Sequence, residues 1–200
     1  MTIVGGVREQ RVPSTVTWGL LAAWVVHDLE EILAFGPWQR AGGFRAMRRR
    51  LPFVPAGVFD AAETITPRRY AVAVGLVGSV VAVASARGTA TGGRSALFQG
   101  LVTGFGLHAA THVAWSTAAG GNTPGIVTTP TIVAPYSWWA RRRLRQAGLA
   151  APVSPSEAAM SVVGAVLLIQ GSHAAAALLD RFVLKPMLDR SSAGGLRRAS

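Results

Sequence analysis

The amino-acid sequence predicts an all-α fold, a polytopic transmembrane helical bundle with four to five membrane segments. Half of the 200 residues are hydrophobic and only 14% are charged. The mean hydropathy of +0.35 is high for a soluble protein and ordinary for a small membrane protein. Apolar stretches long enough for most of a bilayer crossing alternate with stretches rich in arginine, glycine and proline. A chain of this length suits one domain.

Five helical segments are expected, over residues 15–35, 70–86, 95–118, 126–140 and 154–184. Gly36 and Pro37 are expected to end the first helix. The second, made mostly of small and β-branched residues, is interpreted as scaffold. The fourth is short and contains Pro130 and Pro135, so we expect it to be kinked or re-entrant. If it does not span, the positive-inside rule puts both large basic loops in the cytoplasm; with five crossings they face opposite sides, and the orientation stays open.

The chain divides into a polar N-terminal segment, residues 1–14, a transmembrane helical domain, residues 15–184, and a flexible basic tail, residues 185–200. Within the domain, residues 39–69 form a basic connector. Its arginines stand beside aromatic residues, as in amphipathic pieces that lie on a lipid surface. A solvated basic loop is the alternative.

Arginine dominates the charge of the chain. There are 20 Lys and Arg against 9 Asp and Glu, for a net charge of +11. The arginines lie between apolar stretches, where they flank membrane ends and meet anionic lipid headgroups. We therefore expect the lipid bilayer and anionic headgroups as partners, a multi-pass location in the cell membrane, and no nucleic acid. Because the chain has no cysteine, disulfides and thiolate metal sites are excluded.

Ionisable residues stand in the second half of the first apolar stretch. A charge at membrane depth costs several kcal/mol, so it usually faces protein, water or a metal. His27, Glu30 and Glu31 share one helix face at i, i+3 and i+4, whereas Asp28 points about 100° away from His27. An imidazole with two carboxylates suits zinc or iron.

The third apolar stretch contains His108 and His112, spaced i and i+4 on one face. On both helices small residues lie on the same stripe as the polar ones. These small residues are Gly19 and Ala23 on the first helix and Gly100 and Gly104 on the third. We expect the two helices to pack tightly through them and to present their ligands to each other.

The five residues 27–31 spell H-x-x-E-E. With His112 and a Pro124-Gly125 pair before a threonine-bearing apolar segment, the chain resembles the HXXEE family from about residue 16 to the last helix. The resemblance implies a small, multi-helix integral membrane protein without an assigned activity. The family pattern has a tyrosine two residues before the P-G pair, where this chain has Asn122.

We predict a site for one divalent metal ion, with zinc preferred over iron. The predicted ligands are His27, Glu31, His108, His112 and His173, and the predicted catalytic group is Glu30. Asp28 is expected to belong to the polar network around the ligands, or to orient a ligand histidine through the ring nitrogen that does not face the metal. The alternative is a buried polar network in which carboxylates pair with imidazolium or backbone groups.

Zinc hydrolysis is the first chemistry that such a site favours. Three histidine ligands leave an open position for a water molecule, and Glu30 or Glu31 acts as general base. An iron-dependent oxidase is a second possibility, but membrane hydroxylases of the histidine-box type use more histidines than the four present here. A fainter resemblance is to membrane proteases with a Glu-Glu motif, whose accompanying arginine and asparagine positions are missing.

We therefore expect a metal-dependent membrane enzyme that hydrolyses an apolar or lipid-like substrate. The competing class is not an enzyme. The same residues would then form a path for protons or metal ions, or belong to a receptor or accessory subunit. Such a path would continue through Gln170, His173 and Asp180 of the last helix, whereas a catalytic site would be compact.

Overall fold

The computed structural model describes residues 10–184, and this part of the chain is helical without strands. The predicted tail 185–200 and the first nine residues of the predicted N-terminal segment lie outside the described residues. The elements are α1 Ser14–Arg40, α2 Gly43–Arg50, α3 Ala56–Glu63, α4 Pro67–Ala90, α5 Ala96–Ala119, the π-helix η1 Thr129–Val133, α6 Ala134–Gln146, α7 Pro155–Leu179 and the π-helix η2 Asp180–Leu184. The all-α prediction is confirmed.

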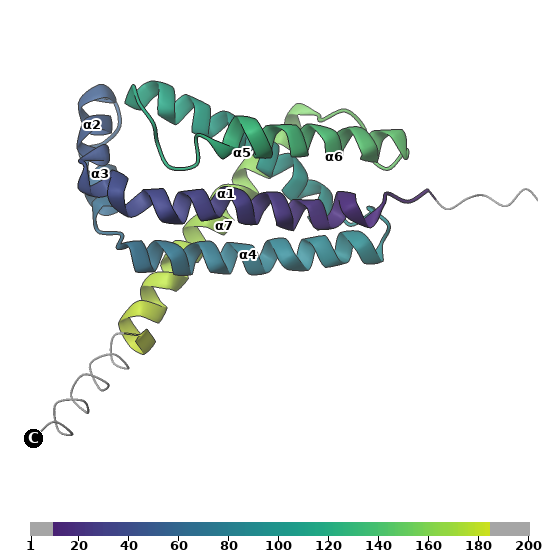
Figure 1. Ribbon diagram of the computed structural model, residues 1–200, viewed down its shortest axis with the longest axis horizontal. Coiled ribbons are helices and arrows are strands. Elements are labelled where there is room, and N and C mark those ends of the chain that lie inside the picture. The colour runs from purple at the N-terminus through teal and green to yellow at the C-terminus, as the bar shows by residue number, and fades with distance from the viewer. Residues whose placement is uncertain (1–9, 185–200) are drawn as a thin grey trace, which may run out of the picture.

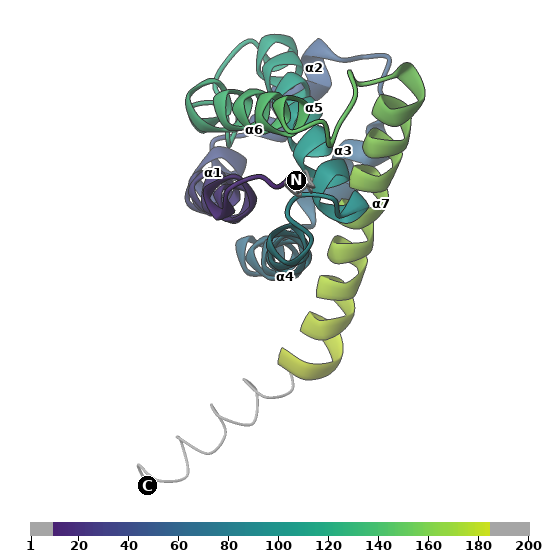
Figure 2. The same cartoon turned by 90° about the vertical axis from the view of Figure 1, so that its right-hand side faces the viewer.

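The long helices form a bundle in which α4 packs against α1, α5 and α7. Figure 1 shows α1 and α4 side by side along the long axis, with α6 running in the same general direction and α7 crossing diagonally. Helices α2 and α3 close one end of the bundle, next to the C-terminal end of α5. Viewed along the long axis, α7 lies on the outside, where it packs against α4 and α5 (Figure 2).

Two apolar clusters hold these elements together. The larger one joins α1, α4, α5, α6 and η1, and its fully buried side chains include Val16, Leu20, Phe98, Val133 and Leu144. These side chains hold the helices together by close packing. The smaller cluster is built on Met47, Leu51 and Phe59 and packs α2 and α3 against the end of α5.

The first helix is longer than predicted, because Gly36 and Pro37 do not end it. It continues to Arg40. Pro37 removes only one backbone donor near the end of the helix, and its own carbonyl accepts from the amide of Ala41 at 3.0 Å. Gly36 instead allows α1 to approach α4 closely, since a Cβ there would lie 3.2 Å from the ring of Pro67 at the start of α4.

The basic connector consists of two short helices with a protein-facing apolar side. Phe44 and Met47 of α2 belong to the smaller cluster, so they pack on protein. Arg48, Arg49 and Arg50 are exposed. The connector is therefore helical where the alternative interpretation expected a loop.

The fourth segment was predicted to be kinked or re-entrant, and it contains a π-helix in place of regular α-helix at its first proline. A proline has no amide hydrogen to donate to an α-turn, and residues 129–133, which include Pro130, form the π-helix η1 before α6 begins. Helix α6 then continues through the arginines to Gln146. Arg141 turns inward, where its guanidinium donates to Glu157 of α7 at 3.0 Å and to Thr103 of α5 at 3.1 Å.

The predicted tight packing of α1 on α5 through small residues is wrong. Gly19 faces α6, where an added Cβ would lie 2.8 Å from the ring of Tyr136. Gly104 faces α7, with Ser161 as its nearest neighbour. Helix η1 contacts both α1 and α5, so the space between these two helices is filled by side chains and by the segment that leads into η1.

Two helices of the described chain are long and apolar enough to cross a membrane. They are α4, with a hydropathy of 1.7, and residues 155–184, with a hydropathy of 1.8. The sequence predicted four to five such segments. The difference lies mainly in α1 and α5, whose ionisable and polar side chains lower the hydropathy of otherwise apolar helices.

Candidate metal site

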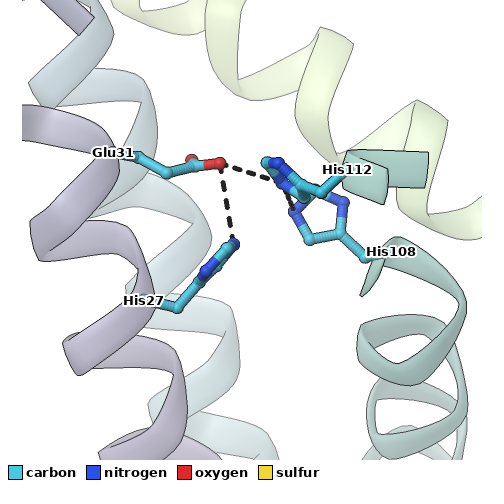
Figure 3. Close-up of side chains that lie close together, drawn as sticks. All are labelled: His27, Glu31, His108 and His112. Carbon is cyan, nitrogen blue, oxygen red and sulfur yellow. Dashed lines mark hydrogen bonds and ion pairs between the residues drawn. The ribbon is translucent and has the colours of Figure 1, made fainter. Parts of the chain in front are cut away.

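Four predicted ligands from two helices meet in the interior. His27 and Glu31 come from α1, and His108 and His112 come from α5. One ligand atom of each residue can be chosen such that all four lie within 4.8 Å of one another. Figure 3 shows the four side chains pointing toward a common centre. On each helix the two residues are one turn apart, so the i, i+4 spacing places both on the face that looks at the other helix.

The carboxylate of Glu31 is the hub of this cluster. Its Oε1 atom lies 3.0 Å from Nε2 of His112 and 3.6 Å from Nε2 of His27. The Nε2 atoms of His108 and His112 are 2.8 Å apart. The imidazole planes stand nearly perpendicular, at 86° to 90° for all three pairs. Nε2 is the atom through which each of the three histidines approaches another member of the cluster.

The deepest member of the cluster has an unused ligand atom. His27 is 0% exposed, and its Nε2 is buried without a hydrogen-bond partner. Buried polar atoms are nearly always paired, so an orphan of this kind needs an explanation. A cation at the centre of the cluster would supply the missing partner, and the site therefore fits a metal ion.

The other nitrogen of His27 defines the tautomer of its ring. Nδ1 lies 2.8 Å from Oγ1 of Thr128, and this hydroxyl also lies 2.6 Å from a carboxylate oxygen of Glu30. The hydroxyl has one proton, and an ionised carboxylate only accepts. Thr128 therefore donates to Glu30 and accepts from Nδ1–H of His27. In the neutral ring this leaves a lone pair on Nε2, directed at the cluster.

Glu30 holds a loop rather than joining the cluster. Its carboxylate accepts from the amide of Val127 at 3.1 Å, the amide of Thr128 at 2.7 Å and the hydroxyl of Thr128. The structure thus separates the two neighbouring glutamates. Glu31 faces the histidines and Glu30 faces the segment after Gly125, because consecutive helix residues point about 100° apart.

Tyr70 supports Glu31 from the far side. Its hydroxyl donates to Oε2 of Glu31 at 2.6 Å, and its ring stacks on Phe35 at 4.2 Å between centroids. The sequence interpretation missed this residue, because Tyr70 begins the helix taken as scaffold. It also missed Thr128. The available signals were a lone tyrosine at the start of an apolar helix and the threonines after the P-G pair.

Gly125 lies directly against the cluster. An added Cβ would be 2.8 Å from Oε1 of Glu31 and 2.8 Å from Cε1 of both His27 and His112. The residue also has φ of +84°, in the region that favours glycine. Both the backbone conformation and the close approach thus require glycine, which gives the P-G pair of the motif a physical role.

Two further predicted residues lie beside the site. His173 of α7 is not part of the four-residue cluster; its ring packs near Tyr70, with centroids 5.9 Å apart. Asp28 is buried, 8% exposed, near Glu31 and Tyr70. It is not hydrogen-bonded to a ligand histidine, and the predicted orienting role falls instead to Thr128.

The fold and the site together define a class of protein: a small all-helical chain with a buried group of three histidines and one glutamate shared by two helices. Residues 18–140 match the model of the family described as "Protein of unknown function with HXXEE motif". The chain belongs to this family. The matched range contains the whole cluster together with Tyr70, Gly125 and Thr128, and it ends before α7. Searches of curated proteins and of solved structures gave no significant match.

Proposed function

We propose that this protein is an integral membrane metalloprotein and that His27, Glu31, His108 and His112 hold one divalent metal ion, zinc in preference to iron. The observation that supports the proposal best is the convergence of four ligand atoms within 4.8 Å, one of them a buried imidazole nitrogen without a hydrogen-bond partner. Three imidazoles and a carboxylate are a donor set typical of zinc, and iron sites use it as well.

The distribution of apolar side chains supports a membrane location. On α1 the ionisable residues His27, Asp28 and Glu31 are buried, while the outward positions Val25, Val26, Leu29 and Leu33 are exposed. On α7 and η2 the exposed large apolar residues include Met160, Val163, Val166, Leu167, Leu178 and Phe182. Exposed apolar surface of this extent is typical of contact with lipid or with a partner. We propose that α1 and α5 cross the bilayer together with α4 and α7.

The reaction that we propose is hydrolysis of an apolar or lipid-like substrate that reaches the site from the bilayer. A bound zinc ion would supply Lewis-acid activation of a water molecule. For hydrolysis the water molecule would replace Glu31 beside the ion, so that His27, His108 and His112 would remain as ligands. Glu31, whose Oε1 faces the cluster and whose Oε2 is held by Tyr70, would then accept the proton. The catalytic role therefore passes from Glu30, which holds the loop, to Glu31.

Elemental analysis of the full chain purified in detergent tests the metal. We expect about one zinc per chain. About one iron per chain would instead favour the oxidase, and a preparation without metal after growth in zinc-supplemented medium would contradict the metal site. Extraction of membranes with alkaline carbonate tests the location. We expect the protein to stay in the pellet, and release into the supernatant would contradict a membrane-spanning protein.

A path for protons or metal ions is the second candidate function, and one observation favours it. The site continues beyond the cluster, from Glu31 through Tyr70 to His173, and α7 ends beside α4 with an ion pair between Asp180 and Arg68. Reconstitution into vesicles with a trapped pH- or zinc-sensitive dye separates the two functions. Flux that His173→Ala abolishes supports the path, whereas hydrolysis that survives this substitution supports the enzyme.

A further inference from the structure

A second candidate site lies at the end of the bundle that α2 and α3 close. A pocket of about 310 Å³ opens between the turn from α1 to α2 and the C-terminal end of α5. We call it the basic pocket. Its walls include Trp38, Arg49, Arg50 and Asn122. Its volume is at the small end of the range for ligand pockets.

The charge of the basic pocket is positive and uncompensated. Arg49 and Arg50 line it without an acidic residue among the lining side chains. Arg48 is paired with Asp60 at 2.9 Å, but within residues 10–184 no carboxylate forms an ion pair with Arg49 or Arg50. Two arginines directed at one cavity are typical of sites for phosphate groups, because the guanidinium fork matches phosphate oxygens.

Glycines let side chains lie directly on the backbone that frames the basic pocket. Gly42 and Gly120 have φ of +84° and +63°, so they also make the two turns that frame it. A Cβ at Gly120 would collide with the guanidinium of Arg50. Gly121 faces open space, because an added Cβ there would meet nothing within 4 Å.

An apolar pocket adjoins the basic one. It measures about 210 Å³ and is lined by Leu51, Phe53, Val54, Ala114, Trp115 and Ala118. The two cavities are lined by the same two parts of the chain, since Arg50 and Leu51 are consecutive and Ala118 precedes Ala119 of the basic pocket, although they have no lining residue in common. Phe53 is 80% exposed at its rim. A basic cavity near an apolar cavity matches a molecule with an anionic head and a hydrocarbon chain.

We infer that this end of the protein binds one anionic phospholipid, with the phosphate against Arg49 and Arg50 and the start of an acyl chain against Phe53 and Trp115. The inference does not depend on the metal site. It does, however, place the lipid close to it, because the segment that lines the basic pocket at Gly121 and Asn122 reaches Gly125 on the cluster three residues later. Trp115, Arg49 and Arg50 are also residue types that are common at the depth of lipid headgroups.

Native mass spectrometry of the full chain in detergent tests the inference, with dioleoyl phosphatidylglycerol as the anionic probe and dioleoyl phosphatidylcholine as its zwitterionic counterpart. We expect one phosphatidylglycerol to be retained per chain at concentrations where phosphatidylcholine is lost. The double variant Arg49→Gln/Arg50→Gln should bind phosphatidylglycerol roughly 10- to 30-fold more weakly, because each arginine near a lipid phosphate contributes a factor of several. Gly121→Leu should weaken binding by filling the pocket.

The matched control is Arg142→Gln/Arg143→Gln, which removes the same charge from α6, where these arginines lie over Trp138 and Trp139. It should leave lipid retention unchanged. An equal loss in both double variants would show only non-specific charge attraction and would overturn the inference, as would unchanged binding in the first. Displacement of the lipid by millimolar inorganic phosphate would show a site for free anions and would also overturn it. Size-exclusion profiles show that each variant is folded.

Discussion

Nδ1 of His27 lies 2.8 Å from Oγ1 of Thr128, although the two residues are 101 positions apart in the chain. The same hydroxyl binds Glu30, the i+3 neighbour of His27 on α1. One threonine thus joins two residues of the H-x-x-E-E motif. The contact presents the free nitrogen of His27 to the cluster and anchors the segment that carries Gly125.

Thr128→Val should lower metal affinity by about 10- to 100-fold, as is usual when a group that orients a histidine ligand is removed. Valine keeps the shape of the side chain but neither accepts from His27 nor donates to Glu30. The affinity is measured by competition with a zinc-sensitive dye. Thr131→Val is the control, since Thr131 is exposed and its hydroxyl binds only the carbonyl of Val127. Thr128→Ser should restore most of the affinity, and equal affinity in all three variants would contradict the orienting role.

His27→Ala and His112→Ala should each remove the metal while the protein still inserts into membranes and extracts as before. The reason is that each substitution deletes one of three imidazole ligands, while Tyr70 still donates a hydrogen bond to the buried carboxylate of Glu31. Elemental analysis after gel filtration measures the result. His173→Ala is the comparison, because His173 lies beside Tyr70 outside the cluster, and it should keep its metal. Full metal content in both His27→Ala and His112→Ala would contradict the proposed metal site.

Gly125→Ala should lose most of its metal. The new methyl group would lie 2.8 Å from three atoms of the cluster. In addition, the backbone strain of alanine at a φ of +84° costs about 1–2 kcal/mol. Gly121→Ala, in the same loop, has open space around its Cβ and should behave like the wild type. The same elemental analysis compares them, and equal metal content would show that the loop moves away from the cluster without cost.

Tyr70→Phe should weaken metal binding by about tenfold while the helices stay in place. Phenylalanine keeps the stack on Phe35 and loses only the hydrogen bond to Glu31. Tyr136→Phe loses a hydrogen bond to the carbonyl of Val16, 2.8 Å long and distant from the cluster. Both variants should lose about 1 kcal/mol of stability, but only Tyr70→Phe should change a zinc titration. A parallel change in both would reduce the role of Tyr70 to packing.

Arg141→Leu should destabilise the fold by about 1–3 kcal/mol. The guanidinium is buried and joins α5, α6 and α7 through Thr103, Glu157 and the carbonyl of Ala151. The expected cost is below that of a fully buried pair, because the side chain of Glu157 is 37% exposed. Thermal unfolding in detergent measures it against Arg142→Leu, whose arginine is exposed. Equal midpoints would show that the pair contributes nothing.

Much of the candidate site was predictable, because it rests on spacing within single helices. The i, i+4 pairs His27 with Glu31 and His108 with His112 each share a face in any α-helix. The two pairs were predicted to meet, and their ligand atoms do converge. The route by which they meet was predicted wrongly, since Gly19 and Gly104 pack on α6 and α7 and not on each other's helices.

The choice between Glu30 and Glu31 shows where sequence reasoning stops. Both residues are compatible with the face of His27, at i+3 and i+4. Only the position of the segment after Gly125 separates them, by giving the carboxylate of Glu30 three hydrogen bonds to Val127 and Thr128. Pro37 is a similar case, because a proline near a helix end is tolerated where the following residues keep their own bonds.

The sequence by itself determined the all-helical fold, the Arg-rich ends of the apolar helices and the placement of histidines and acids inside them, because these follow from composition and from periods within one segment. The tertiary structure alone decided that Tyr70, Gly125 and Thr128 surround the ligands, that Arg141 turns inward, and that Arg49 and Arg50 line a pocket. These contacts join residues far apart in the chain, and their existence depends on how helices pack rather than on how any one of them forms.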